Sequence, residues 1–422
     1  MSNDNIIPKV TVVDSIMGSG KTTAAINMIN NSSDDVHYLY ITPYLDEVER
    51  IIQSCPKKKF KQPKFIRGSK LQNIKDLINK GHNIVSTHSL FKKFNKETIE
   101  LAYINNYVLI MDEVAEVVEV YTEEIKDGEN KRLIAREDIC TILEKYAYVD
   151  EESHLLRWTD QSYPDNGVFG NIKRMAQLDS LTLYGDQMIL WLFPVATFKA
   201  FKHIYILTYL FDSQIQKYYY DLFNIEYEKL SAGIINGKYG FTEYINNHNV
   251  CNINYDKLIN IVESEKLNSI GDFDYSLSKN WYKNASKETL KKLKNNIYNF
   301  FYNVTKTKTE NNLWTTFKKF KPIISGKGYT RGFAPLNSRA TNQYKDRNAV
   351  AYPVNRFLDP NVRNYFVSHG IDVNEDEYAL SEMLQFIWRS SIRDEKPITI
   401  YIPSNRMRIL LKMWIYNMCK QI

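Results

Sequence analysis

The stretch at residues 10–25, VTVVDSIMGSGKTTAA, joins a run of β-forming residues to a loop of small residues and then to a helix-forming run. This order is typical of a phosphate-binding P-loop, whose pattern is G-x-x-x-x-G-K-[ST]. Gly18, Ser19 and Gly20 allow the backbone N–H groups to close around a phosphate, and the helix N-terminus adds positive potential. Ser15 replaces the first glycine of the pattern. The stretch therefore predicts a binding site for a nucleoside triphosphate.

The residues after the loop predict how the triphosphate is held. Lys21 is placed to reach the β- and γ-phosphates, and Thr22 offers a hydroxyl to Mg²⁺. Thr23, the next residue, is also expected to belong to the nucleotide-binding segment. Further along, the apolar run YVLIM (107–111) ends in Asp112 and Glu113. One carboxylate, Asp112, can hold Mg²⁺ while Glu113 orients the attacking water, as phosphoryl transfer to water requires. ATP and Mg²⁺ are the expected ligands.

The first 110 residues alternate between strand and helix patterns. Strands are expected over 36–42, 83–87 and 107–111, with helical stretches over 45–55 and 89–94, so the fold class is α/β with a parallel sheet. From residue 116 to about 152 the pattern is acidic and is interpreted as helical, and 150–170 is interpreted as a loop. We therefore expect an insertion of helix and loop in the first lobe, over about residues 114–180. A buried strand is expected within 201–211.

Length and composition indicate a folded protein of more than one domain. The chain has 422 residues, 44% of them hydrophobic and 25% charged, and a domain usually takes ~150 residues. The glycines of SAGIINGKYG (231–240) suggest a boundary, which gives lobe 1 at 1–230 and lobe 2 at 231–422. The sequence contains neither a long apolar run nor a leader pattern, so we expect a cytoplasmic protein without a membrane partner. The four cysteines are widely spaced and are interpreted as reduced thiols.

The net charge of +6 is distributed unevenly. Residues 279–331 contain thirteen Lys or Arg but only two acids, and ten aromatic residues are interleaved with them. Such a segment suits a polyanion, because cations neutralise phosphates and exposed rings stack on bases. Lys318, Lys319 and Lys321 are the candidate contacts. The alternative is that the apolar residues of the segment form a core and the lysines are a solvated face.

Residues 10–113 resemble the first motor lobe of superfamily 2 helicases. The matching segments are MGSGKTT (17–23) as motif I, YITPYLDEVERI (40–51) as motif Ia, STHSLF (86–91) as motif Ib and MDEVAE (111–116) as motif II. They are most similar to origin-binding-protein-type and bacteriophage DNA helicases. The resemblance implies two RecA-like P-loop NTPase lobes with parallel sheets, and ATP hydrolysis coupled to nucleic acid.

The same resemblance implies which residues touch nucleic acid. Motif Ia and Ib residues contact the tracking strand in this family, which would place Thr42, Thr87 and His88 at the phosphates. A helix-capping or core role is the alternative for His88. The family's coupling motif falls at ILTYLFD (206–212), where Thr208 is the candidate, or at PVAT (194–197).

A second resemblance lies near the C-terminus, in ALSEMLQFIWRSSIR (379–393). A helix is expected over 378–393, with Gln385, Arg389 and Arg393 at i, i+4 and i+8 on one face. This arrangement resembles motif VI, whose arginine stabilises the transferred phosphoryl group. Either Arg389 or Arg393 is the candidate arginine finger. The alternative is that the arginines pair with acids such as Glu382.

These observations predict an ATP-dependent translocase or helicase that acts on single-stranded or forked DNA rather than RNA, in replication or recombination of a phage or low-GC bacterium. Replication proteins are expected partners, and for a phage protein the location is the host cytoplasm. Two alternatives stay open. A terminase-like packaging ATPase would need a metal-binding carboxylate cluster, for which Asp272 and Asp274 are the hint. A replication-initiation factor would use ATP only as a switch.

Overall fold

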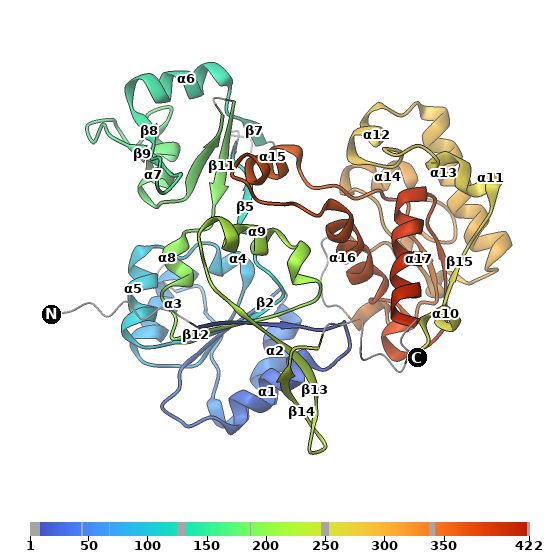
Figure 1. The fold of residues 1–422 in the computed structure, drawn as a ribbon, viewed down its shortest axis with the longest axis horizontal. Coiled ribbons are helices and arrows are strands. Elements are labelled where there is room, and N and C mark those ends of the chain that lie inside the picture. The colour runs from blue at the N-terminus through green and yellow to red at the C-terminus, as the bar shows by residue number, and fades with distance from the viewer. Residues whose placement is uncertain are drawn as a thin grey trace. The chain divides into compact units, whose positions relative to one another are not determined.

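The computed structural model describes residues 9–419 except 44, 67, 125–130, 186, 246–252 and 337–341. The chain divides into two compact units (Figure 1). The first comprises residues 1–14, 20–243 and 359–373, and the second comprises residues 15–19, 244–358 and 374–422.

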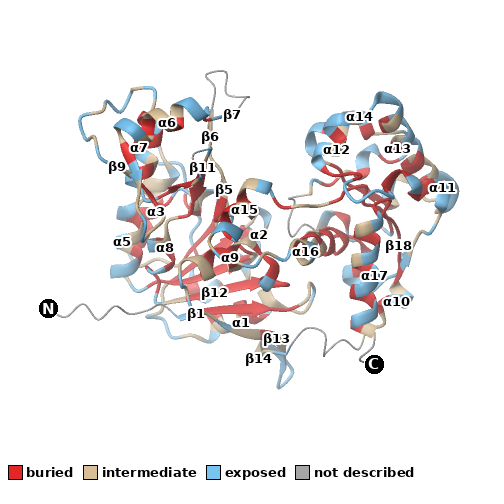
Figure 2. Ribbon diagram, turned by 45° about the horizontal axis from the view of Figure 1, so that its top comes forward, coloured by how far each residue is buried: buried red, intermediate tan, exposed pale blue. Residues whose placement is uncertain are grey.

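A seven-stranded sheet forms the framework of the first unit. Its strand order is β14-β13-β1-β12-β4-β2-β3, and its neighbours run parallel except for the antiparallel pair β13 and β14. The strands are β1 (Lys9–Asp14), β2 (Tyr38–Thr42), β3 (Ile84–Thr87), β4 (Val108–Asp112), β12 (His203–Thr208), β13 (Glu228–Ile235) and β14 (Lys238–Glu243). Every residue of β2 and β4 is buried (Figure 2), as near-continuous apolar strands between helical layers should be. The expected strands in the first 111 residues are confirmed.

Helices connect these parallel strands, as crossover connections require. They are α1 (Lys21–Asn31), α2 (Leu45–Ser54), α3 (Lys70–Asn79), α4 (His88–Phe91), α5 (Lys96–Ile104), α8 (Val195–Phe198) and α9 (Ile215–Leu222). The strand expected within 201–211 is β12, which lies between β1 and β4 in the centre of the sheet.

The insertion between β4 and β12 differs from the expected helical segment. It contains a three-stranded antiparallel sheet in the order β10-β11-β5 and two hairpins, β6-β7 and β8-β9. The elements are β5 (Val118–Val120), β6 (Thr122–Glu124), β7 (Lys131–Leu133), α6 (Arg136–Lys145), β8 (Ala147–Val149), β9 (Leu156–Trp158), α7 (Gly170–Gln177), β10 (Leu181–Tyr184) and β11 (Met188–Leu192). The helical interpretation of 116–152 is wrong outside α6, because the β-branched and aromatic residues of VEVYT (118–122) favour strands over a helix.

The glycine-rich segment expected to separate two lobes is a β-hairpin of the first unit. Its turn is Asn236-Gly237, and both residues have positive φ, at 50° and 78°. Asn-Gly with two positive φ values is the signature of a tight hairpin turn that matches strand twist. The first unit therefore continues to Glu243 rather than ending at residue 230.

One helix from the second half of the sequence belongs to the first unit. α15 (Pro360–Ser368) packs against β5, β10 and α9. Phe366 contributes a ring 5.8 Å from that of Tyr218, and His369 lies 4.6 Å, ring to ring, from His154 of the insertion. The chain thus returns to the first unit between residues 359 and 373 before it continues in the second.

The second unit is built on a four-stranded sheet in the order β15-β18-β17-β16, with all neighbours parallel. The strands are β15 (Ile259–Ile261), β16 (Asn312–Trp314), β17 (Ala349–Ala351) and β18 (Ile398–Tyr401). The helices are α10 (Tyr255–Leu258), α11 (Glu265–Asn268), α12 (Lys279–Asn284), α13 (Lys287–Asn299), α14 (Lys321–Ile324), α16 (Glu375–Ile387) and α17 (Asn405–Cys419). Both units are therefore α/β, in agreement with the expected class.

Most aromatic residues of the basic segment are core residues of this second unit. Tyr282, Phe300, Phe301, Phe320 and Tyr329 all belong to one buried cluster with Leu290, Leu293 and Ile297. Their rings are not available to stack on bases, whereas Lys318 and Lys319 lie exposed. Within the described part of the chain, none of the helices is both long and apolar enough to cross a membrane.

Candidate functional site

The expected P-loop has the backbone conformation that its glycines permit. β1 ends at the buried Asp14, and α1 begins at Lys21. Gly18 and Gly20 have φ values of 85° and 86°, in the left-handed region that side chains disfavour. Gly20 is the N-cap of α1 and supplies no capping side chain. The first N–H groups of α1 are therefore suited to an anion.

The two expected halves of the magnesium site lie together. The Thr22 hydroxyl donates to Oδ2 of Asp112 over 3.3 Å, and the phenol of the buried Tyr40 donates to the same oxygen over 3.3 Å. A hydroxyl beside a carboxylate at a strand end is the hard-oxygen donor set that Mg²⁺ takes, usually with waters and phosphate oxygens completing its shell. The residues present fit Mg²⁺, which would neutralise phosphate charge there.

Burial raises the pKa of Asp112 to about 6, and the nearby charges of Glu113 and Glu47 act in the same direction. The positive charges of Arg50 and Lys21 act in the opposite direction. The side chain is only 8% exposed. A buried carboxylate with a raised pKa is stabilised in its ionised form by a cation, which agrees with the proposed Mg²⁺ position.

Glu113 follows β4 in an unusual conformation. Its φ is 76°, and its backbone N–H donates to the carbonyl of Leu207 in β12 over 2.9 Å. A non-glycine residue in this region costs on the order of 1–3 kcal/mol, and such residues gather at active sites. The strained backbone of Glu113 turns the chain directly after Asp112, the last residue of β4.

Asp14 is a site residue that the sequence did not single out. Its buried carboxylate accepts hydrogen bonds from the backbone N–H groups of Leu210 (2.9 Å) and Phe211 (3.1 Å). Burial raises its pKa. These bonds anchor the segment after β12 to the residue directly before the P-loop. The available signal was an aspartate at the end of an otherwise apolar strand.

The segment that Asp14 anchors is the one proposed to carry the coupling motif. Thr208 ends β12 and is paired in register with Asp14. Its hydroxyl is buried and has no hydrogen-bond partner among the described residues, as is also true of Thr197 in the competing PVAT segment. The two candidates for the coupling motif therefore stay open.

The expected nucleic-acid residues of the first unit lie at the ends of neighbouring strands. Thr42 and Thr87 are paired in register at the ends of β2 and β3. Thr42 is fully buried, whereas Thr87 and His88 are half-buried. The ring Nε2 of His88 lies 3.0 Å from the backbone carbonyl of Asp112. His88 thus links the start of α4 to the end of β4.

The helix expected over 378–393 is wrong beyond residue 387. α16 ends at Ile387, where the hydroxyl of Ser390 donates to the Ile387 carbonyl over 2.6 Å. The ring of Trp388 packs 5.4 Å from that of Trp414. These contacts end the helix, so Gln385, Arg389 and Arg393 do not share one helical face.

The two arginines have different environments. Arg389 is 3% exposed, and its guanidinium donates to the carbonyls of Pro335 (2.8 Å) and Leu336 (2.9 Å). Arg393 lies exposed in a 3-10 turn, Ser391–Asp394. The salt bridge of Glu382 is made by Arg356 over 3.1 Å. Arg389 is therefore engaged in holding a loop of its own unit, and Arg393 is the arginine available to a ligand.

Two further expectations concern the second unit. Lys321 lies 4.5 Å from the centroid of the Phe333 ring, while Lys318 and Lys319 are exposed. Asp272 and Asp274, the hint of a second metal site, are exposed in a turn. Across the residues that the structure describes, no group of three or more His, Cys, Asp or Glu is placed to hold a metal ion.

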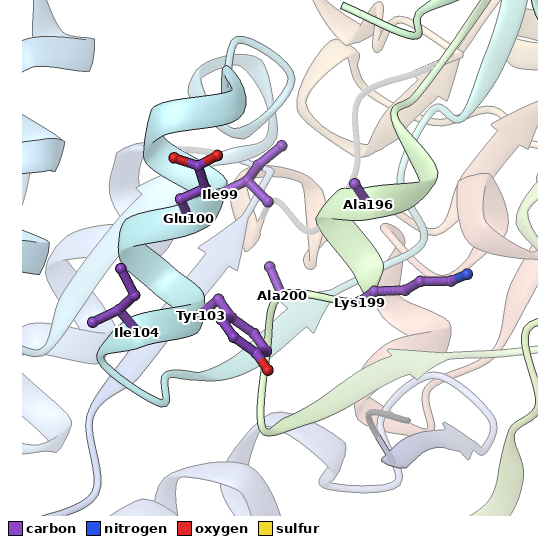
Figure 3. A pocket seen from close by; sticks show the side chains of 7 residues that line it. All are labelled: Ile99, Glu100, Tyr103, Ile104, Ala196, Lys199 and Ala200. Carbon is purple, nitrogen blue, oxygen red and sulfur yellow. The ribbon is translucent and has the colours of Figure 1, made fainter. Parts of the chain in front are cut away.

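A hollow of about 290 Å³ lies elsewhere on the first unit (Figure 3). Ile99, Tyr103 and Ile104 of α5 line one side, and Ala196, Lys199 and Ala200 in and after α8 line the other. Its lining is mainly apolar and contains none of the predicted site residues.

Two protein-family models match this sequence, one in each half of the chain. Residues 3–138 match the DEAD/DEAH box helicase family, and residues 253–415 match the YonV C-terminal Rossmann-like domain. The SPbeta prophage-derived uncharacterized protein YonV of Bacillus subtilis (strain 168) is 42% identical over 427 residues, which cover 97% of this chain and 99% of that protein.

Solved structures are similar only at a general level. The structure described as XPD_APO has a TM-score of 0.48 at 12% identity and covers 97% of this chain and 96% of its own. S. tokodaii Xpd4 has a TM-score of 0.44 at 11% identity, with 97% and 95% coverage. By its 42% identity to YonV the chain belongs to the YonV family; it has an α/β fold with mostly parallel sheets and, through the DEAD/DEAH box helicase match of residues 3–138, is an ATP-dependent helicase-type hydrolase that acts on nucleic acid.

Proposed function

We propose that this protein is an ATP-driven translocase on single-stranded or forked DNA, of the origin-binding and bacteriophage helicase type, which serves replication or recombination in a host cytoplasm. The observation that carries the proposal is the hydrogen bond between His88 and the Asp112 carbonyl. It connects the motif Ib position, where the tracking strand is expected, to the residue that would hold Mg²⁺. The prophage origin of the YonV relative supports the phage role.

In this proposal the first lobe performs the chemistry. The N–H groups of the loop and Lys21 bind the phosphates of ATP, and Thr22 and Asp112 hold Mg²⁺. Glu113 orients a water, which attacks the γ-phosphorus while the bond to the bridging oxygen of ADP breaks. Arg393 in the second lobe is the proposed arginine finger, with Gln385 as a further contact to the nucleotide.

The nucleic-acid contacts proposed for the first lobe are Thr87 and His88, with the fully buried Thr42 paired beside Thr87 on the neighbouring strand. DNA that pulls on the backbone at residues 87–88 would move the Asp112 carbonyl through the His88 ring. This arrangement predicts ATP turnover that rises when single-stranded DNA is bound. In the second lobe the exposed Lys318 and Lys319, with Lys321 beside them, are the proposed phosphate contacts.

The test is steady-state ATP hydrolysis by the full chain with and without single-stranded DNA, and with RNA of the same sequence. Lys21→Ala is the matched control, because it removes the proposed phosphate contact at the first residue of α1 without altering the core. We expect DNA to stimulate the wild type, and Lys21→Ala to be inactive with an unchanged melting temperature. Turnover that DNA leaves unchanged would favour a nucleotide switch, and stimulation by RNA alone would overturn the assignment to DNA.

His88→Ala tests the coupling by itself. The basal rate should stay close to that of the wild type, because the His88 ring meets Asp112 at its backbone carbonyl and not at its carboxylate. The stimulation by DNA should be lost at saturating DNA concentration. Equal loss of basal and stimulated rates would instead assign His88 a purely structural role.

A further inference from the structure

The β13–β14 hairpin extends beyond the strand that leads into the P-loop. The last residue of β1 paired with β13 is Val13, opposite Leu230. β13 continues for five residues to Ile235 before the turn, and β14 packs against α1 on its return (Figure 1). The tip of the hairpin therefore projects past the end of β1, on the side where the P-loop and the start of α1 lie.

Tyr239, near the tip of this hairpin, lies against the P-loop. A Cβ atom placed on Gly20 would overlap Cδ1 and Cε1 of the Tyr239 ring, so the ring rests directly on the α-carbon of that glycine. The side-chain amide of Asn27 in α1 donates to the Tyr239 carbonyl over 2.9 Å and fixes the hairpin to the helix. The tyrosine remains 39% exposed, so the ring touches the loop and also reaches solvent.

The order of the sheet indicates which part of a nucleotide would meet this ring. Thr22 and Asp112 mark the place of Mg²⁺ and the terminal phosphates. Asp112 lies on β4, which is separated from β1 by β12, whereas β13 is the neighbour of β1 on the opposite side. A nucleotide with its terminal phosphates at Asp112 and its β-phosphate in the P-loop extends away from β4, toward the hairpin.

We propose that Tyr239 is the platform on which the base of the bound nucleotide stacks, an inference that rests on the proposed ATP site. Two features then require glycine at position 20: its positive φ, and the close approach of the Tyr239 ring, which leaves no room for a Cβ atom. Stacking on an aromatic ring is tolerant of base identity, because every base has a π-face. The site should therefore bind ATP and GTP with affinities within a few-fold of each other.

The experiment compares a ligand that has a base with one that has none. Calorimetry with the full chain and Mg²⁺ measures the binding of ATP, GTP and inorganic tripolyphosphate to the wild type and to Tyr239→Leu, Tyr239→Ala and Tyr239→Phe. Leucine keeps apolar packing on Gly20 but removes the aromatic face. Phenylalanine keeps the face and removes the hydroxyl.

We expect Tyr239→Leu and Tyr239→Ala to weaken ATP and GTP binding about tenfold, the typical loss for one stacked base. Their affinity for tripolyphosphate should match the wild type, and Tyr239→Phe should bind all three ligands normally. Equal weakening of ATP and tripolyphosphate by the leucine variant would mean that the ring only supports the loop. Unchanged ATP affinity in the leucine variant would place the base elsewhere. Either result overturns the proposal.

The Lys21→Ala variant separates this inference from the proposed function. It should lose ATP and tripolyphosphate together, because the lysine serves the phosphates. If the Lys21→Ala variant binds both ligands normally, the proposed ATP site itself is contradicted. If Lys21→Ala loses the binding of ATP and tripolyphosphate, but the Tyr239 variants show no effect specific to the base, the ATP site is supported and only the stacking role of Tyr239 is contradicted.

Discussion

The hydroxyl of Thr22 and a carboxylate oxygen of Asp112 lie 3.3 Å apart, although 90 residues separate them in the sequence. β1 and β4 bring them to the same edge of the sheet, with β12 between the two strands. Parallel strands end at a common edge, and helices then carry loop residues over that edge. The hydroxyl of Thr22 thus lies at Asp112, the first residue of the acidic dipeptide, which is the one we propose to hold Mg²⁺.

Glu113→Gln should therefore trap ATP. Binding requires Lys21, Thr22 and Asp112, whereas Glu113 is needed to position water. We expect the glutamine variant to bind ATP with Mg²⁺ as tightly as the wild type and to hydrolyse it at least about 10²-fold more slowly. Asp112→Ala should lose Mg²⁺-dependent affinity instead. Equal loss of ATP affinity in both variants, measured by calorimetry, would contradict the divided roles.

The raised pKa of Asp112 predicts a pH-dependent stability in the absence of nucleotide. The folded-state value of about 6 exceeds the ordinary value of 3.8, so the folded protein binds this proton more tightly than the unfolded chain. Stability is then lost as the pH rises from about 4 to 7, by up to about 3 kcal/mol from this group. Asp112→Asn should remove that loss. Urea denaturation at pH 5 and pH 7.5 measures it, and an equal effect of the substitution at both pH values would contradict the prediction.

The same pKa has the opposite consequence for ligand binding. Mg²⁺ requires the ionised carboxylate, so the affinity for ATP with Mg²⁺ should fall as the pH is lowered through about 6. Calorimetry with and without Mg²⁺ between pH 5 and pH 8 distinguishes this effect from protonation of ATP. If the gain in ATP affinity that Mg²⁺ provides stays constant over this pH range, Asp112 does not hold the ion.

The two arginines should respond differently to substitution. Arg389→Ala leaves the carbonyls of Pro335 and Leu336 without their charged donor, which should cost about 3 kcal/mol in the free energy of unfolding. Arg393→Ala should leave stability within about 0.5 kcal/mol, since the residue is exposed. Turnover in Arg393→Ala should fall roughly 10³-fold with ATP affinity nearly intact. Normal turnover in Arg393→Ala would exclude it as the arginine finger.

Replacing Lys318, Lys319 and Lys321 with glutamine should flatten the salt dependence of single-strand binding. Each lost phosphate contact lowers the slope of log K against log salt by about 0.7, so the triple variant should lose about 2 in slope. Lys291→Gln with Lys292→Gln on α13 is the matched control, because it removes exposed charge elsewhere in the basic segment. An unchanged slope in the triple variant would assign those lysines to a solvated face.

Local sequence patterns determined the framework of the first unit. Apolar runs predicted β1, β2, β3 and β4, and the small residues predicted the loop in which Gly18 and Gly20 have positive φ. These features depend on neighbours in the chain, so a single sequence reveals them. The insertion was misread because its charged residues were taken as a helical surface, although the β-branched and aromatic residues among them, in VEVYT (118–122), favour strands.

Contacts between distant segments were decided only by the tertiary structure. The anchoring of Leu210 by Asp14, the bond from His88 to the Asp112 carbonyl and the ring of Tyr239 on Gly20 join residues whose separation in sequence leaves no periodic signal. The return of α15 to the first unit and the burial of Arg389 have the same origin. Sequence therefore determined which chemical groups this protein carries and the strands on which they lie. Packing determined which of them meet, because burial and hydrogen-bond satisfaction are properties of the whole fold.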